Sequence, residues 1–128
     1  MAHILIVDDL PEATRLLSHM LATAGHTTVQ FTRGEDVVTS LEQEYADLLV
    51  VDLNMPEMDG FALVDYIRTR SPQHDIPIVV ATASRSNEDR FAAFEVGADA
   101  FITKPFTRAA LLEAVDSLLH LKPVEESW

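Results

Sequence analysis

The fold class of this chain is decided by one stretch, Leu48-Leu49-Val50-Val51-Asp52-Leu53-Asn54-Met55-Pro56-Glu57-Met58-Asp59-Gly60. Four apolar residues run without alternation into Asp52, which is typical of a strand buried on both faces inside a parallel sheet. The residues that follow favour turns. Because open parallel sheets bind ligands where their strands end, we expect the Asp52 carboxylate at the mouth of such a sheet. A lone Asp at a strand end more often solvates itself or caps a turn, so its role depends on its neighbours.

Short apolar runs alternate with helical patterns along the rest of the chain. The runs predict strands at 3–7, 27–31, 47–52, 76–81 and 98–103. Helical patterns begin near Pro11, Gly34, Phe61 and Asn87, and Thr107 is expected to cap a fifth helix. This alternation with short connections predicts an α/β fold, a doubly wound five-stranded parallel sheet with five helices on its two faces.

The first helix is predicted from the period of its apolar residues. Ala13, Leu17, Met20 and Ala24 keep a helical period after Pro11. Gly25 is expected to stop this helix, since glycine is common just past a helix end.

Length, composition and charge limit the possible functions. The 128 residues predict one domain at 1–122, followed by a C-terminal tail or linker stub at 123–128. The chain has no cysteine, no apolar run long enough for a membrane span and no signal-peptide pattern at its start, which favours the cytoplasm. A net charge of −12 argues against direct binding of nucleic acid.

Polar residues follow four of the apolar runs. Asp8 and Asp9 end the first run and Asp52 the third, while Thr82 and Lys104 follow the fourth and fifth. Because the ends of parallel strands meet at one edge of the sheet, we expect these side chains to converge. Three adjacent carboxylates repel one another and need a cation, and their oxygen ligands suit Mg²⁺, with Mn²⁺ as an alternative. A metal, a hydroxyl and an ammonium around a carboxylate nucleophile suit phosphoryl transfer.

Each of these residues also has a simpler explanation. Asp8 and Asp9 could start a helix, Thr82 could be an ordinary β-branched strand residue, and Lys104 could be a solvated loop lysine. Taken singly, each explanation is the better one. Their occurrence at successive strand ends favours a functional site.

The ordered set of motifs resembles the receiver domain of two-component response regulators, the family of the chemotaxis protein CheY. The resemblance covers Ile4 to Leu121 and rests on these motifs: Val7-Asp8-Asp9, Asp52 with Met55-Pro56 and Asp59-Gly60, Thr82-Ala83, and Lys104-Pro105-Phe106. It implies the strand order 2-1-3-4-5. It also implies a cis Lys104–Pro105 bond.

The resemblance assigns roles to the site residues. Asp52 would accept a phosphoryl group from a histidine kinase or a histidine phosphotransfer protein. Asp9 would hold Mg²⁺ directly and Asp8 through water, with Asp52 and the backbone carbonyl of Asn54 as further ligands. The remaining roles fall on Thr82, the Ala83 backbone and Lys104 as phosphoryl contacts, on Thr82 and Phe101 as switch residues, and on Asn54 and Ser84 as residues that tune dephosphorylation. Such a chain is a phosphoacceptor with self-catalysed uptake and loss, not an enzyme.

A surface formed by the fourth helix, the fifth strand and the fifth helix is expected to bind a downstream target or a second copy of the chain. In the helix at 87–96, Phe91 is predicted to face inward with Ala92, Ala93 and Val96, whereas Phe94 should be partly exposed. The other members of this surface are expected to be Arg90, Phe101, Ala110 and Ala114. Phe94 could instead merely cover the sheet edge.

Other functions were weighed on the residues. Haloacid dehalogenase-type phosphatases need two acidic residues one apart on the first strand, and Asp8-Asp9-Leu10 fails that spacing. An interaction domain with an idle site stays open, as does the N-terminal receiver of a longer regulator. Met1 stands just before the first strand, which we take as an expectation against excision from the far end of a hybrid kinase.

Overall fold

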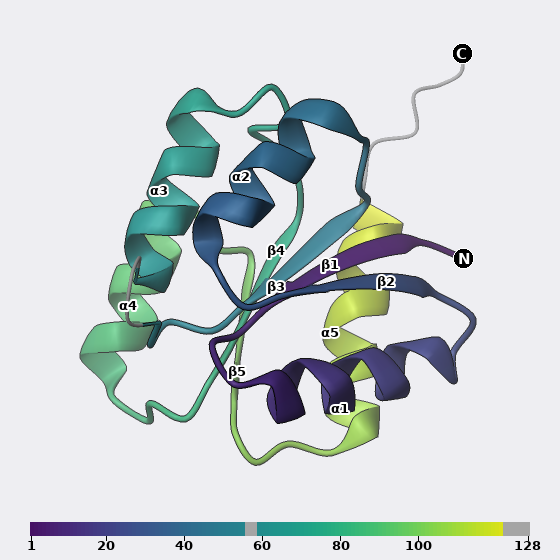
Figure 1. Ribbon diagram of the computed structural model, residues 1–128. Coiled ribbons are helices and arrows are strands. Elements are labelled where there is room, and N and C mark those ends of the chain that lie inside the picture. Colours follow the sequence, from purple (N-terminus) through teal and green to yellow (C-terminus); the bar gives the residue numbers. More distant parts are fainter. Residues whose placement is uncertain (56–58, 122–128) are drawn as a thin grey trace.

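Five strands and five helices form in residues 1–55 and 59–121, which are the residues that the structure describes (Figure 1). In this computed structural model the strands are β1 (His3–Val7), β2 (Thr27–Phe31), β3 (Leu48–Val51), β4 (Ile78–Thr82) and β5 (Ala100–Thr103). The helices are α1 (Pro11–Ala22), α2 (Gly34–Gln43), α3 (Gly60–Arg70), α4 (Asn87–Val96) and α5 (Arg108–Leu121). All neighbouring strands are parallel, in the order β2-β1-β3-β4-β5, which confirms the predicted fold.

Some expectations lie outside the described residues. They concern the turn residues Pro56 and Met58 and the tail at 123–128. Within the described part of the chain, no helix has both the length and the apolar character that a membrane crossing requires.

Helices cover both faces of the sheet (Figure 1), and alternate residues of the central strands pack on opposite faces. One face packs against α2 and α3 through Leu5, Val7, Leu49, Val51 and Ile78. The other packs against α1 and α5 through Ile4, Ile6, Leu48, Val50 and Val79. A third cluster joins Val80 and Phe101 to Ala93 of α4. The apolar run before Asp52 is unbroken because both faces of β3 are buried under helices.

The strands β1 and β2 and the helix α4 have the predicted bounds, whereas three strands differ. β3 is one residue shorter than predicted at each end. Asp47 lies just before it and pairs with His3, since the Asp47 N–H donates to the His3 carbonyl and the His3 N–H donates to the Asp47 carboxylate, both at 2.8 Å. β4 begins two residues later, since Pro77 lacks an N–H to donate, and it extends to Thr82. β5 is also two residues shorter at its start.

The first helix is shorter than predicted, because α1 ends at Ala22 and Thr23 caps it, before the expected stop at Gly25. The buried residues of this helix are Thr14, Leu17 and Leu21, and Ala24 lies beyond the helix and is exposed. Thr14 is tolerated inside because its hydroxyl donates to the Pro11 carbonyl at 2.8 Å and also bonds the Gln30 side chain at 3.0 Å. A satisfied hydroxyl on the buried face is what an apolar pattern misses.

Arg68 ties together three segments at the amino-terminal edge of the sheet. Its guanidinium donates to the carbonyls of Gly97 at 3.0 Å and of His74 and Ile76 at 2.7 Å each. It also donates to the Asp99 carboxylate at 2.9 Å. Gly97 has a φ of +123°, and a Cβ there would lie 2.7 Å from Arg68 Cγ, so glycine is required at this close approach.

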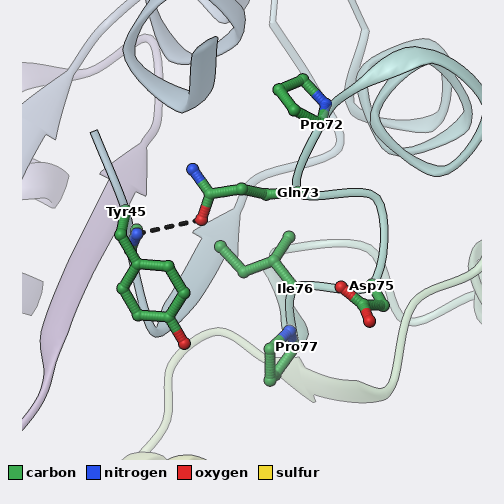
Figure 2. Close-up of a pocket in the computed structure, with 7 residues that line it drawn as sticks. Tyr45, Pro72, Gln73, Asp75, Ile76 and Pro77 are labelled. Carbon is green, nitrogen blue, oxygen red and sulfur yellow. Dashed lines mark hydrogen bonds between the residues drawn. The ribbon is translucent and has the colours of Figure 1, made fainter. Parts of the chain in front are cut away.

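Gln73 fixes the same edge from the other side (Figure 2). Its side-chain carbonyl accepts from the Ala46 N–H at 3.0 Å, and its amide donates to the carbonyls of Leu41 and Glu44. Beside it lies a cavity of about 350 Å³ whose walls include Tyr45 and Pro77. This cavity is lined by none of the acidic residues predicted to form the site.

We expect Arg68→Ala to lower the free energy of unfolding by about 2–4 kcal/mol, because carbonyls of two loops lose a shared donor. Arg70→Ala is the matched control, since Arg70 lies two residues further along α3 and its guanidinium stacks on Tyr66, 5.9 Å from the ring centroid. Arg70→Ala should lower the free energy of unfolding by less than about 1 kcal/mol. Urea unfolding followed by circular dichroism measures both. Equal losses in the two variants would contradict this role of Arg68.

Candidate functional site

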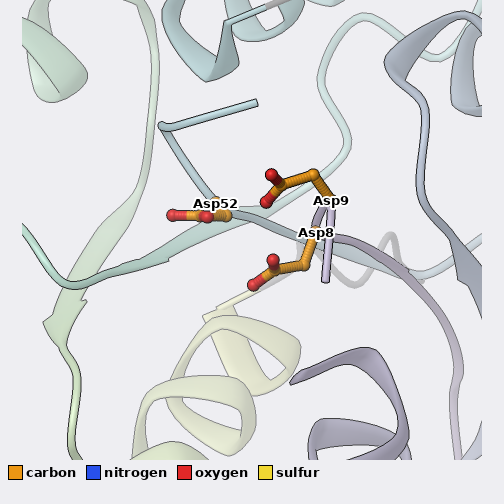
Figure 3. Close-up of side chains that lie close together, drawn as sticks. All are labelled: Asp8, Asp9 and Asp52. Atoms are coloured by element: carbon orange, nitrogen blue, oxygen red, sulfur yellow. The ribbon is translucent and has the colours of Figure 1, made fainter. Parts of the chain in front are cut away.

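The register between β1 and β3 brings three carboxylates together. Val7 pairs with Val51, so the residues that follow, Asp8 and Asp52, lie next to each other. The Asp52 N–H donates to the Val7 carbonyl at 3.1 Å. Figure 3 shows the side chains of Asp8, Asp9 and Asp52 pointing toward one another. One oxygen of each lies within 4.8 Å of the others, which makes a set of oxygen ligands for one metal ion.

Asp8 already has partners for both carboxylate oxygens. It is 1% exposed, and the Lys104 ammonium donates to it at 2.5 Å. Its second oxygen accepts from the Leu10 N–H at 3.0 Å. Lys104 is placed by its own N–H, which donates to the Thr82 carbonyl at 2.7 Å, and the Lys104–Pro105 bond is cis, as expected. Asp8 and Lys104 thus form a nearly neutral pair.

Asp52 and Asp9 keep charge that Lys104 does not offset. Burial raises the pKa of Asp52, and the negative charge of Asp8 raises it further, whereas Lys104 and a hydrogen bond from the Thr82 hydroxyl lower it. Burial and the adjacent Asp8 also raise the pKa of Asp9. The Oδ1 atom of Asp52 is buried and has no hydrogen-bond partner among the described residues. A buried carboxylate oxygen without a partner is costly, so the site suits a cation or a reacting group there.

Gly60 and Asp59 hold the chain that follows Asp52. The Gly60 N–H donates to the Leu53 carbonyl at 2.8 Å. A Cβ at Gly60 would lie 2.5 Å from the Asp52 carbonyl oxygen, so only glycine allows α3 to start here. Asp59 caps α3, because its carboxylate accepts from the Ala62 N–H at 2.7 Å. Asp59 and Gly60 thus place the first turn of α3 directly against the backbone of Asp52.

Thr82 lies at the end of β4, fully buried beside the cluster. Its hydroxyl accepts from the Ser84 N–H at 3.3 Å, and the Ser84 hydroxyl donates to Asp89 at 2.6 Å. The sequence reasoning named Thr82 and Ser84 but missed Asp89. The available signal was the pattern Ser86-Asn87-Glu88-Asp89, a helix capping box, in which the Ser86 hydroxyl accepts from the Asp89 N–H at 3.1 Å.

The family follows from comparison with known proteins. A model of the response regulator receiver domain matches residues 4–116. The chain belongs to the response regulator receiver family. Receivers are phosphoacceptor modules of two-component signal transduction, which agrees with the resemblance drawn from the motifs.

Curated relatives of this receiver are longer proteins. The transcriptional regulatory protein GltR of Pseudomonas aeruginosa is 38% identical over 117 residues, which are 91% of this chain and 48% of GltR. The transcriptional regulatory protein GlrR of Escherichia coli is 36% identical over 129 aligned positions, and the match covers 99% of this chain and 29% of GlrR. The chain therefore spans half or less of the length of these relatives.

Solved receivers share the fold over nearly their whole length. The receiver domain of a signal transduction histidine kinase from Syntrophus aciditrophicus has a TM-score of 0.87 and 34% identity, covering 100% of this chain and 98% of that one. The receiver domain of the sensor histidine kinase PA1611 from Pseudomonas aeruginosa has a TM-score of 0.85 and 27% identity, covering 93% and 98%. That structure has a magnesium ion coordinated in the active site cleft.

The fourth helix of this receiver exposes more aromatic surface than predicted. The prediction that Phe91 faces inward is wrong, because Phe91 is 66% exposed, whereas Ala93 is buried. Two residues along a helix turn the side chain by about 200°, so these two residues cannot share a face. Phe94 is 40% exposed and packs on Phe101 at 6.5 Å between ring centroids. Arg90 lies over both of these rings.

The charges of the cluster predict opposite effects of two similar substitutions. Because the pKa of Asp52 is raised above 3.8, the folded state binds that proton more tightly than the unfolded chain does, and ionisation opposes folding. Asp52→Asn should therefore raise the free energy of unfolding at pH 7, and this gain should vanish as the pH falls below about 3.8. Asp8→Asn should lower it by about 1–3 kcal/mol, because Lys104 loses its ion pair.

Urea unfolding of both variants at several pH values tests these signs. Asp59→Asn is a control that keeps the acidic cluster intact. A loss of stability at pH 7 in Asp52→Asn would mean that the Asp52 carboxylate stabilises the fold, contrary to the expectation.

Proposed function

We propose that Asp52 accepts a phosphoryl group from a phosphohistidine of a histidine kinase or a histidine phosphotransfer protein. The observation that carries this proposal is the buried Oδ1 atom of Asp52, which has no hydrogen-bond partner among the described residues. A lone pair of this carboxylate attacks phosphorus, the P–N bond to the donor histidine breaks, and its electron pair returns to the ring nitrogen. The product is an aspartyl phosphate.

Mg²⁺ is the proposed metal, with Mn²⁺ as an alternative, because the donors are all hard oxygens. Asp9, Asp52 and the Asn54 carbonyl would hold it. Asp8 would assist through water, since its own oxygens are bonded to Lys104 and the Leu10 N–H. When bound, the ion supplies positive charge that offsets the carboxylates and the phosphoryl oxygens.

The side chains around Asp52 supply the other contacts of the phosphoryl group. The Thr82 hydroxyl and the Ala83 N–H are proposed to donate to its oxygens, and Lys104 to offset its charge. Lys104 is paired with Asp8 at 2.5 Å and lies close enough to the cluster to lower the pKa of Asp52. Asn54 and Ser84 are proposed to tune the lifetime of the aspartyl phosphate, and a Ser84→Glu substitution is expected to change it.

Intact-mass analysis after incubation with acetyl phosphate tests the acceptor and the metal together. With Mg²⁺ the wild type should gain one phosphoryl group, and with EDTA it should gain none. Asp52→Asn should gain none in either condition, whereas Asp59→Asn should behave like the wild type. Full labelling of Asp52→Asn would refute the assignment, and equal labelling in EDTA would refute the metal requirement.

The output is proposed to be binding by a surface on α4, β5 and α5. Its members are Arg90, Phe94, Phe101, Ala110 and Ala114, and the exposed Phe91 now extends it. Two exposed phenylalanines on one short helix suit docking of a downstream protein or a second copy of this chain. Thr82 and Phe101 are the proposed switch residues, with Phe101 at present 9% exposed beneath Arg90 and Phe94. An output domain attached in a longer protein is the alternative occupant.

Phe94→Ala should leave phosphoryl uptake intact and weaken phosphorylation-dependent association at least tenfold, the loss typical of an interface anchor. Tyr45→Ala is the matched control, because Tyr45 is an aromatic residue that is 64% exposed and lies between α2 and β3, outside the α4, β5 and α5 surface. Sedimentation velocity with and without beryllofluoride, a phosphoryl mimic, measures self-association, and a pull-down measures other partners. Unchanged association in both Phe94→Ala and Phe101→Ala would place the output surface elsewhere.

A further inference from the structure

Asp89 lies outside the acidic cluster, yet hydrogen bonds connect it to the site. The Ser84 hydroxyl donates to the Asp89 carboxylate at 2.6 Å. The Ser84 N–H donates to the Thr82 hydroxyl at 3.3 Å. Thr82 is fully buried at the end of β4, and its hydroxyl lies close enough to the Asp52 carboxylate to lower the pKa of that group. The first turn of α4 is thereby linked to the phosphoacceptor through one loop.

This linkage departs from an ordinary helix capping box. In such a box the acidic side chain at the third helical position bonds back to the N–H of the capping residue. Here the Ser86 N–H donates to the Ser84 hydroxyl at 3.3 Å, and that hydroxyl donates to Asp89. Ser84 is thus inserted between the two partners of the box. The Ser86 hydroxyl still accepts from the Asp89 N–H at 3.1 Å, which fixes Asp89 from its backbone.

The direction of the donors sets the orientation of the Thr82 hydroxyl. A hydroxyl has one hydrogen, and the Thr82 oxygen receives the Ser84 N–H, so its own hydrogen is left for another acceptor. The Asp52 carboxylate, whose pKa the Thr82 hydroxyl lowers, is near enough to be that acceptor. The charge of Asp89 strengthens the bond that holds Ser84, since hydrogen bonds to carboxylates are shorter and stronger than neutral ones.

We infer that Asp89 is a positioning residue for phosphoryl transfer: through Ser84 it holds the Thr82 hydroxyl in the orientation that donates toward Asp52. This inference rests on the proposed function of Asp52. It gives Ser84 a role before the phosphoryl group arrives, in addition to any effect on its lifetime. It also explains why the third residue of α4 is an aspartate, which can accept the Ser84 hydrogen bond, and not a residue with high helix propensity alone.

The test measures the rate of phosphoryl uptake from acetyl phosphate with Mg²⁺ by intact mass. Asp89→Ala should slow uptake about fivefold, the rate equivalent of one ordinary hydrogen bond. Asp89→Asn keeps an acceptor oxygen for Ser84 and should recover most of the rate. Glu88→Ala is the matched control, because Glu88 has the same charge in the same turn and is exposed. Its rate should equal that of the wild type.

A double variant distinguishes a positioning role of Asp89 from a general structural effect of its loss. In Thr82→Ala, which lacks the hydroxyl to be oriented, adding Asp89→Ala should cause no further slowing. Should Asp89→Ala unfold, which circular dichroism detects, Ser84→Ala removes the same bond from the other side and should slow uptake equally. Wild-type rates in Asp89→Ala and Ser84→Ala, or full additivity with Thr82→Ala, would overturn the inference. A wild type that takes up no phosphoryl group would instead overturn the proposed function, and this inference with it.

Discussion

The site depends on the pairing of β1 with β3. Because Val7 pairs with Val51, the residues that follow them, Asp8 and Asp52, are adjacent. A slip of one residue would turn every side chain of β3 to the opposite face and separate the two carboxylates. The register is fixed by burial on both faces, since the core clusters of the two faces share no residue of β3. The core thus holds together charges that would otherwise repel.

The cluster divides its charge unequally, and this division decides its chemistry. Lys104 lies 2.5 Å from Asp8, which is the most buried of the three carboxylates. Asp52 and Asp9 are left with raised pKa values, for which burial is the largest cause. A buried carboxylate oxygen that no positive group contacts is preorganised to bind a cation. The packing of the core holds the carboxylates together despite their repulsion. The arrangement is therefore costly for stability and useful for binding.

The sequence predicted the strands and the acidic cluster because each rests on a pattern local to a few residues. Unbroken apolar runs require two covered faces, and residues after parallel strands meet at one edge. It failed for Thr14 and Phe91, where the helix face depends on how α1 and α4 rotate against the sheet. It also did not reveal Arg68, whose acceptors belong to loops that meet only in the folded chain. Contacts of this kind have no periodic signature.

Helix α4 joins the two parts of the molecule that a receiver must connect. Asp89, in its first turn, contacts the loop beside Thr82, and the next residue, Arg90, lies over the rings of Phe94 and Phe101. Consecutive residues of one helix therefore contact the loop after Thr82 and the proposed output surface. A helix is stiff over this distance, so a shift of Ser84 that moves Asp89 also moves Arg90. Energetic coupling needs such a contiguous path together with an element that has two arrangements. The proposed switch residue Phe101 lies under Arg90, at the output end of this path.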